Sequence, residues 1–317
     1  MAKSTKKYDV AIIGGGPAGL SAGIYTARAR LSSLLIERGA VGGQIINAEW
    51  VENYPGFTES ISGIDLTEAM HKQATRFGLE TLVAGVTGIK ITGRQKVVKT
   101  SQGDFTAKAV IVAGGSERLK LGVPGEAEYT GKGVSYCATC DGPFFRDKEV
   151  AVVGGGNAAI TEAIELTKFA SKITVIHRRD ELRATKILQE KAFAEKKIKF
   201  LWDSTLEEIA GDAFVDKITV SNVKTKKKTV LNVSGVFMAV GFRPNTGYLK
   251  DIVKLDDIGA IITNERMETS VPGIFAAGDI RSSSIRQVIA AAGDGAVAAI
   301  SAEKYISGQA GLFAEKS

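Results

Sequence analysis

Residues 8–19 read YDVAIIGGGPAG, a short apolar strand that runs into a glycine turn. The apolar positions after the turn recur at helical spacing, so the segment predicts a strand, a turn and a helix. Residues 149–159, EVAVVGGGNAA, repeat this pattern. The first glycine permits a tight turn, the second lets the backbone approach a pyrophosphate, and the third position lets helix and strand pack closely. Two copies predict an α/β chain with two Rossmann-like dinucleotide-binding domains.

The residue that ends the following strand differs between the two copies. Glu37 ends the first such strand, and an acid there accepts hydrogen bonds from a free ribose 2′-hydroxyl. At the same spacing the second copy has His177, followed by Arg178 and Arg179, with Arg183 one turn on. Guanidinium groups bind a 2′-phosphate that an acid would repel. We therefore expect FAD or NAD at the first site and NADP at the second, unless the arginines are only a solvated helix start.

Cys137 and Cys140 are the two cysteines of the chain and form a single C-x-x-C. A secreted disulfide scaffold needs more cysteines at dispersed spacings. A structural zinc site needs four ligands, which His71, His177 and carboxylates would have to complete. The pair therefore favours a redox role in a reducing, cytoplasmic compartment, and we expect no metal.

The composition is that of a globular protein of about two domains. The 317 residues are 44% hydrophobic, and 41 Lys+Arg against 35 Asp+Glu give a formal net charge of +6. This surplus is spread out, so no nucleic-acid partner is expected. The basic run at residues 224–228 reads as a solvated hairpin turn. The uncharged residues 10–27 contain Pro17 and several glycines, and we expect neither a membrane span nor a targeting segment.

Two further segments indicate which nucleotide the first site takes. After the first acid comes a glycine-rich loop with GGQ at residues 42–44 and ENYPGF at residues 52–57. Near the C-terminus, IFAAGD at residues 274–279 precedes RQV at residues 286–288 and an Ala/Gly-rich helix. These segments resemble parts of the flavoprotein disulfide reductases that bind two dinucleotides, and this resemblance favours FAD at the first site. An Ala-Gly-Asp alone could be a strand-to-loop turn.

The cysteine pair lies just before the strand of the second glycine motif, in CATCDG at residues 137–142. With the segments above, GGGN at 154–157, HRR at 177–179 and PNT at 244–246, the whole chain resembles the low-molecular-weight thioredoxin reductases, which are FAD- and NADPH-dependent pyridine nucleotide-disulfide oxidoreductases. The resemblance implies a homodimer whose partner is thioredoxin or a thioredoxin-like protein.

The order of the motifs implies an inserted domain. The first glycine motif and the Gly-Asp segment lie at opposite ends of the chain, so the FAD domain is expected to be discontinuous, at residues 1–119 and 249–317. Residues 120–248 would form the NADP domain that carries the C-x-x-C.

The resemblance also implies roles for individual residues. Electrons would pass from NADPH through FAD to the Cys137–Cys140 disulfide and on to thioredoxin. Cys140 would exchange electrons with the flavin, and Cys137 would attack thioredoxin. Asp141 would be the acid that protonates a leaving thiolate or a flavin-bound sulfur, although its sequence context also suits a cap or turn residue.

The binding residues expected from these motifs share the glycine turns, the strand ends and the C-terminal segment. For FAD they are Gly14, Gly16, Pro17, Ala18, Gly19, Glu37, Arg38, Gly43, Gln44, Asn53, Ala113, Gly114, Gly278, Asp279, Arg286, Gln287 and Val288. For NADP they are Gly154, Gly156, Asn157, Ala158, Ala159, His177, Arg178, Arg179 and Arg183.

Three positions depart from the resemblance and keep alternatives open. Ala158 stands where the family usually has Ser or Thr, Thr161 where it usually has an acid, and Gly114 where Thr is commoner. A lost neutral hydrogen bond costs about 0.5–1.5 kcal/mol, so NADP affinity could fall several-fold. The alternatives are a related reductase that takes electrons from ferredoxin or a deazaflavin, a non-enzymatic thiol redox sensor, and a ferredoxin–NADP reductase, which lacks the dithiol.

Overall fold

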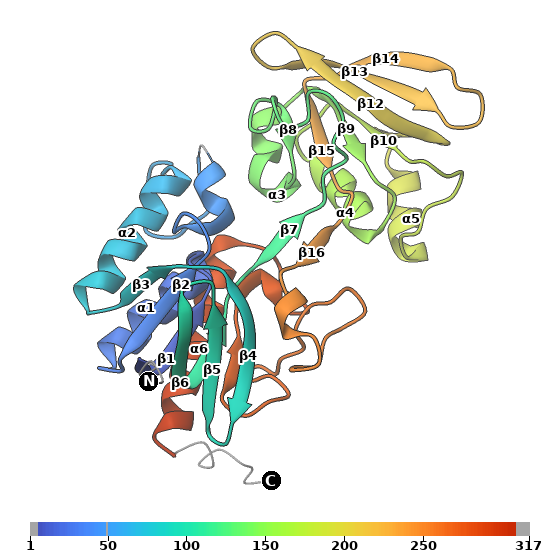
Figure 1. Ribbon diagram of the computed structural model, residues 1–317. Helices are drawn as coiled ribbons and strands as arrows, with labels where there is room; N and C mark the ends of the chain where they lie inside the picture. The colour runs from blue at the N-terminus through green and yellow to red at the C-terminus, as the bar shows by residue number, and fades with distance from the viewer. Residues whose placement is uncertain (1–5, 49, 309–317) are drawn as a thin grey trace, which may run out of the picture. The chain divides into compact units, whose positions relative to one another are not determined.

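The computed structural model describes residues 6–48 and 50–308, and the chain divides into two compact units (Figure 1). Unit 1 consists of Met1–Glu117 and Arg243–Ser317, and unit 2 of Arg118–Phe242. The two segments that join the units, β7 (Ser116–Arg118) and β16 (Phe242–Pro244), pair with each other. The predicted fold class, an α/β chain with one unit inserted into another, is confirmed. The residue limits and the nucleotide assigned to each unit stay predictions.

Within the described residues, unit 1 is built on a seven-stranded sheet of order β3-β2-β1-β6-β5-β4, with β17 also paired to β6. β1, β2, β3, β6 and β17 pair in parallel, whereas β4, β5 and β6 form an antiparallel meander. The strands are β1 (Lys7–Ile13), β2 (Ser33–Glu37), β3 (Glu80–Val83), β4 (Val86–Thr92), β5 (Gln95–Thr100), β6 (Gly103–Val112) and β17 (Ile274–Ala276).

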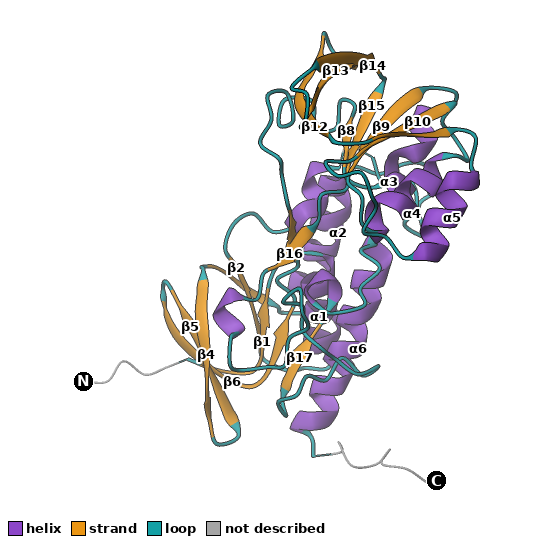
Figure 2. Ribbon diagram, turned by 90° about the vertical axis from the view of Figure 1, so that its right-hand side faces the viewer, coloured by secondary structure: helices purple, strands orange, loops and turns teal. Residues whose placement is uncertain are grey.

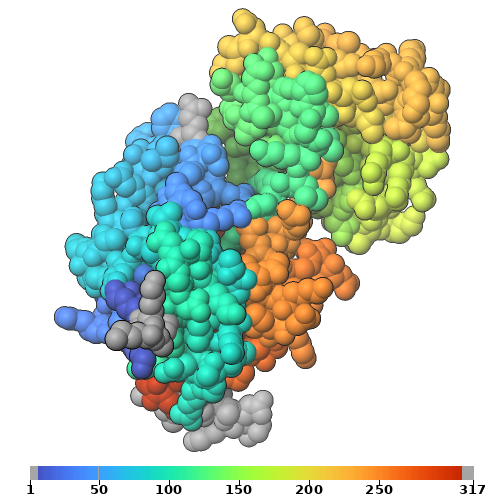
Figure 3. Space-filling model, viewed as in Figure 1, coloured from blue at the N-terminus to red at the C-terminus, as the bar shows by residue number. Residues whose placement is uncertain are grey.

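Both faces of this sheet are covered, which explains the continuous apolar run of β1. Val10 and Ile12 pack with the helices α1 (Pro17–Arg28), α2 (Gly63–Arg76) and α6 (Val288–Ile306) on one face. Ala11 and Ile13 point to the other face, where residues 249–261 complete the core. α1 and α6 lie side by side although they come from opposite ends of the chain (Figure 2). The space-filling view likewise shows blue-to-teal and orange segments against one another in this unit (Figure 3).

Unit 2 contains a parallel sheet of order β11-β10-β9-β15-β8 and an antiparallel sheet of order β12-β13-β14. The strands are β8 (Val134–Ser135), β9 (Glu149–Val153), β10 (Lys172–Ile176), β11 (Ile198–Leu201), β12 (Ser204–Gly211), β13 (Val215–Asn222), β14 (Lys228–Asn232) and β15 (Gly235–Met238). The helices are α3 (Ala138–Asp141), α4 (Asn157–Leu166) and α5 (Lys186–Ala194).

The basic run connects β13 to β14, so the predicted hairpin turn is confirmed. The exposed side chain of Lys224 places its Nζ 2.9 Å from Asp203 Oδ2 and 3.2 Å from Asp180 Oδ2. In the described part of the chain, no helix is both long and apolar enough to cross a membrane.

The described residues also form short 3₁₀ turns. They are η1 (Gly43–Asn47), η2 (Gly142–Phe145), η3 (Gly247–Leu249) and η4 (Gly278–Ile280).

Lys96 of β5 is a buried lysine that joins strands to the last helix. Its side chain is almost fully buried, and Nζ donates to the carbonyl oxygens of Arg94 at 3.2 Å and Lys108 at 3.1 Å. Nζ also donates to the Tyr305 hydroxyl of α6 at 3.0 Å. A single cation therefore satisfies acceptors on the loop before β5, on β6 and on α6.

Replacing Lys96 with methionine should destabilise the protein by about 2–4 kcal/mol, because the apolar volume is kept but three hydrogen bonds, all partly buried, are lost. The urea midpoint of the purified protein measures the effect. Lys99→Met, on the same strand with an exposed side chain, is the matched control and should leave the midpoint unchanged. Equal midpoints for the two variants would contradict the assigned role.

Candidate active site

The first glycine turn joins β1 to α1 and has no room for larger residues. Gly14 has φ +109°, and a Cβ there would lie 2.3 Å from the carbonyl oxygen of Ala113. A Cβ on Gly19 would lie 1.8 Å from the carbonyl oxygen of Gly14. Gly16 is the N-cap of α1 and Pro17 follows it, with neither a side-chain cap nor an acid in the first turn. The free N–H groups and the positive dipole end at this helix start suit a phosphate.

Glu37, at the end of β2, is tied to the same turn. Its Oε2 accepts from the Gly15 N–H at 2.7 Å, and its Oε1 accepts from the Gly39 N–H at 3.0 Å. These two bonds fix the carboxylate and leave it lone pairs for ribose hydroxyls. The following residue, Arg38, forms an ion pair with Glu117.

The glycine-rich loop that follows closes over this turn. Gly43 lies so near that a Cβ on it would be 2.9 Å from the Gly16 Cα. Gln44 donates its side-chain amide to the Ser116 carbonyl. Asn53 donates to the Gln287 side-chain oxygen at 3.2 Å. The loop after β2 therefore meets the C-terminal segment, as two parts of one site should.

The C-terminal Gly-Asp segment lies beside the start of α1. Gly278 has φ +76°, and a Cβ on it would lie 2.9 Å from the Ala18 Cβ. Asp294 of α6 accepts from the Gly278 N–H at 3.1 Å and from Arg281 Nε at 2.8 Å. Asp279 accepts from the Ser284 hydroxyl at 3.0 Å. A partly buried ion pair between Arg281 and Asp294 thus fixes the turn that presents Asp279.

These observations fit FAD. The glycine backbones of Gly16 and Gly43 leave a cradle that side chains would fill, and Glu37 provides an acceptor at its edge. Just after β6, the carbonyl oxygen of Gly114 accepts a hydrogen bond from the side-chain amide of Asn245 at 2.9 Å. The three atoms nearest to a Cβ position on Gly114 belong to Ile280, Tyr248 and Asn245, at 3.4, 3.6 and 3.9 Å. Pro17 and Ala113 follow the carboxyl ends of the parallel strands β1 and β6, where α/β sheets bind ligands. Arg286 lies just before α6, and Val288 is its first residue.

The second glycine turn, in unit 2, repeats the first. Gly154 has φ +147°, and a Cβ on it would lie 2.5 Å from the Ala239 carbonyl oxygen and 2.8 Å from the Ala159 Cβ. Gly156 is the N-cap of α4, and no atom lies within 4 Å of a Cβ position there. Ala158 is exposed in the first turn of the helix. This helix start is likewise free of a side-chain cap and of acids.

Asn157 and the loop after β10 hold each other in place. Asn157 Oδ1 accepts from the Thr185 N–H at 2.8 Å, and the Gly155 carbonyl accepts from the Arg183 N–H at 2.8 Å. The side chains of Arg178, Arg179 and Arg183 are exposed, and among the described ion pairs none involves them. Three exposed guanidinium groups beside a dinucleotide turn fit a 2′-phosphate.

His177 differs from its arginine neighbours because it is buried, with an exposed fraction of 5%. A Cβ on Gly155 would lie 2.3 Å from its Nδ1, so the ring covers the glycine turn. Burial lowers the pKa of His177, a backbone hydrogen bond at Glu181 raises it, and the nearby arginines lower it again. Its Nε2 has no hydrogen-bond partner among the described residues. This neutral ring supports the loop, and its contact with a nucleotide stays a prediction.

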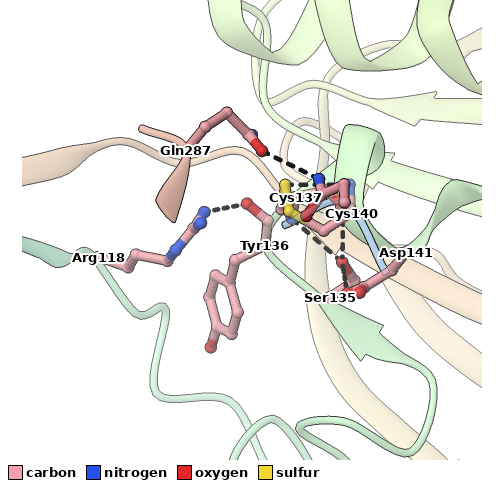
Figure 4. Close-up of a disulfide and its surroundings, with 8 residues drawn as sticks. Arg118, Ser135, Tyr136, Cys137, Cys140, Asp141 and Gln287 are labelled. Carbon is pink, nitrogen blue, oxygen red and sulfur yellow. Dashed lines mark hydrogen bonds between the residues drawn. A yellow bond between two sulfur atoms is a disulfide. The ribbon is translucent and has the colours of Figure 1, made fainter. Parts of the chain in front are cut away.

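The two cysteines form a disulfide at the start of α3, as Figure 4 shows. Cys137 is the N-cap of this short helix, and its Sγ accepts from the Cys140 N–H at 3.2 Å. A donor aimed at sulfur stabilises the thiolate that forms when the disulfide is reduced. The pair is therefore built for thiol–disulfide exchange.

Asp141 follows the disulfide and is held by one hydroxyl (Figure 4). Ser135 Oγ donates to Asp141 Oδ2 at 2.6 Å. Burial raises the pKa of Asp141, while the Ser135 hydrogen bond and the charge of Arg118 lower it. A carboxyl whose pKa is raised beside a redox-active disulfide is suited to proton transfer.

Each unit holds a glycine turn of the kind that binds dinucleotides, and unit 2 also carries the disulfide. These features are typical of one class of redox enzymes. The family model of the pyridine nucleotide-disulphide oxidoreductases matches residues 8–295, and the chain belongs to this family. It is therefore an oxidoreductase.

Within this family, the chain is similar to proteins named thioredoxin reductase. The one from Bacillus subtilis (strain 168) is 49% identical, over 95% of this chain and 95% of its own length. The one from Peptoclostridium acidaminophilum is 48% identical, over 94% of this chain and 97% of its own length.

Solved structures agree. The thioredoxin reductase of Streptococcus pyogenes MGAS5005 has a TM-score of 0.92 at 48% identity, covering 96% of this chain and all of its own. The thioredoxin reductase of Giardia duodenalis has a TM-score of 0.91 at 38% identity, again covering 96% of this chain and all of its own. The family resemblance inferred from the sequence is confirmed.

Three residues of the site were not singled out by the motifs. Ser135, Asp294 and Arg281 lie outside the glycine turns and hold the acid and the Gly-Asp turn through hydrogen bonds. Ser135 lies two residues before Cys137, which is its only signal in the sequence. Asp294, inside an Ala/Gly-rich helix, could have been noticed as a charge on an otherwise apolar segment.

Proposed function

We propose that the chain is a thioredoxin-disulfide reductase that takes an electron pair from NADPH and delivers it to oxidised thioredoxin through the Cys137–Cys140 pair. The observation that carries the proposal is the disulfide itself, which lies at a helix start beside a partly buried acid. The names of the similar proteins support thioredoxin as the partner.

Unit 1 would hold FAD and unit 2 would hold NADPH. The glycine turn, Glu37, the Gly43 loop and the Gly278–Asp279 turn would bind FAD. FAD, when bound, accepts a hydride from a nicotinamide and gives up an electron pair to a disulfide. Arg178 and Arg179 would bind the 2′-phosphate that distinguishes NADPH from NADH.

Cys137 and Cys140 have different roles in thiol–disulfide exchange with thioredoxin. The Cys137 thiolate attacks the thioredoxin disulfide, forms a mixed disulfide and releases one thioredoxin thiolate. The Cys140 thiolate then attacks the Cys137 sulfur, which restores the Cys137–Cys140 disulfide and releases the second thiolate. Each released thiolate takes a proton, and thioredoxin has gained two electrons.

The proposal includes a homodimer in the cytoplasm, where thiols are kept reduced. α6 carries exposed apolar side chains, namely Ile289, Val297 and Ile300, that would suit an interface between copies. This part of the proposal rests on the resemblance.

Anaerobic titration of the flavin-loaded protein tests the proposed function. NADPH should bleach the flavin absorbance at low concentration, NADH only at much higher concentration, and oxidised thioredoxin should restore the colour. If dithionite bleached the flavin but neither nucleotide did, the electron donor would be ferredoxin or a deazaflavin instead. Failure of thioredoxin to reoxidise the reduced protein would contradict the partner.

A further inference from the structure

Ser135 lies between the redox disulfide and the acid. It is the last residue of β8, its exposed fraction is 4%, and its hydroxyl donates to Asp141 Oδ2 at 2.6 Å. The same Oγ accepts from the Cys137 N–H at 3.1 Å and lies 3.4 Å from the Cys137 carbonyl oxygen. One hydroxyl thus bridges the acid and the backbone of the first cysteine (Figure 4).

We propose that Ser135 is a positioning residue for disulfide reduction, whose hydroxyl holds the Asp141 carboxyl at the Cys137–Cys140 pair in both protonation states of that carboxyl. This inference rests on the proposed thioredoxin-disulfide reductase function and deepens it. Ser135 forms no bond with the substrate and acts through Asp141.

The hydrogen-bonding capacity of a serine matches this role. A hydroxyl has one donor and two acceptor positions. When Asp141 is ionised, the Ser135 O–H points to Oδ2 while the Cys137 N–H occupies one lone pair. When Asp141 is protonated, its O–H occupies the second lone pair, and the Ser135 O–H turns to the Cys137 carbonyl. The contacts at 2.6, 3.1 and 3.4 Å provide every partner that the two states need.

The proton balance defines what Asp141 contributes. Reduction breaks the Sγ–Sγ bond, adds the electron pair supplied by the nicotinamide donor, and leaves two thiolates. One of them takes the proton that Asp141 loses, so the protonated carboxyl is the active form. Because burial favours that form, activity falls as the pH rises through the pKa of Asp141.

The charged groups around Asp141 are Arg118 and the acids of the neighbouring helix. Arg118, whose guanidinium donates to the Tyr136 carbonyl, lowers the pKa of Asp141. The helix packed against α3 is α4, and its titratable residues are Glu162 and Glu165. Glu165 lies 3.0 Å from Lys168 in an exposed ion pair. Ser135 is the uncharged partner, so its removal changes the hydrogen bond without changing the net charge.

Replacing Ser135 with alanine should lower the rate of thioredoxin reduction about tenfold, because a misplaced acid transfers its proton poorly. The alkaline limb of the pH–rate profile should also move to higher pH, since the ionised carboxylate loses a donor. Asp141→Asn should lose this limb. Ser135→Ala added to Asp141→Asn should cause far less than its full loss, because the main effect of Ser135 passes through the acid and only the bond from the Cys137 N–H remains to be lost. Ser221→Ala, a buried serine of β13 in the same unit, should leave rate and profile unchanged.

A second readout needs neither nucleotide nor thioredoxin. Reduction of the disulfide by dithiothreitol at one pH, followed by alkylation of the freed thiols, should slow in Ser135→Ala and stay unchanged in Ser221→Ala. NADPH-driven reduction of ferricyanide, which bypasses the dithiol, should be retained in both variants. A Ser135→Ala profile that superimposes on that of the unmodified protein, or a loss that adds fully to that of Asp141→Asn, would overturn the inference. If the unmodified protein reduced no thioredoxin with NADPH, the proposed function would fail, while the dithiothreitol rates would still decide the role of Ser135.

Discussion

The Cys140→Ser variant should lose thioredoxin reduction by at least about 10³-fold while it keeps FAD. A serine hydroxyl forms no disulfide, so the electron pair has no dithiol to reach and Cys137 has no resolving partner. The backbone N–H of residue 140 that donates to the Cys137 sulfur is retained, which should preserve α3. Thioredoxin-dependent oxidation of NADPH measures the loss, and the flavin absorbance measures the retained cofactor.

Two comparisons make this experiment decisive. Cys137→Ser should be inactive for the complementary reason, because it lacks the attacking thiol. Both variants should still reduce ferricyanide with NADPH, since that reaction does not require the dithiol. Thioredoxin reduction near the unmodified rate in either variant would refute the role of the disulfide.

The Arg178→Ala, Arg179→Ala double variant should lower kcat/KM for NADPH by about 10²-fold or more and leave that for NADH nearly unchanged. Each hydrogen bond to a charged group contributes about 1.5–3 kcal/mol, and NADH has no 2′-phosphate to lose. Both side chains are exposed, so the effect on folding should be small. Kinetics with the two nucleotides in parallel give the measurement.

The control is an arginine of the same unit. Arg146 is exposed and lies over the Phe169 ring at 5.9 Å. It precedes β9, whereas the glycine turn follows the carboxyl end of that strand. Arg146→Ala should leave kcat/KM unchanged for both NADPH and NADH. The NADPH preference of the unmodified chain should also weaken with added salt, because exposed charges are screened. Equal losses for NADPH and NADH in the double variant would mean that the arginines do not bind the 2′-phosphate.

The strand–turn–helix units and the cysteine pair could be predicted from the sequence because local spacing encodes them. A Cβ on Gly19 would clash with the nearby Gly14 carbonyl, and a Cβ on Gly14 would clash with Ala113, just after the neighbouring strand β6. The insertion of one unit into the other could also be predicted, since the resemblance assigns motifs in both halves of unit 1 to one site.

Other features depend on contacts between residues far apart in the chain, which no local pattern reports. Lys96 lies two positions from Val98 on the buried face of β5, and its burial depends on Tyr305 of a distant helix. The sequence places His177 next to the arginines that are expected to bind NADP, yet its ring packs on Gly155. Ser135 and Asp294 position other residues, and such supporting roles become visible only when hydrogen-bond partners are known.

The split of unit 1 has a consequence for how the protein is made. On the ribosome, β1 and α1 emerge first, but β17 and α6, which complete their sheet and cover their face, emerge last. Unit 2 is a continuous segment and can finish folding while unit 1 still lacks a strand and a helix. The turn at Gly14–Gly19 is therefore completed by Gly278 and Asp279 only late in synthesis. If this is the FAD site that we propose, the nascent chain acquires its flavin only when synthesis is nearly complete.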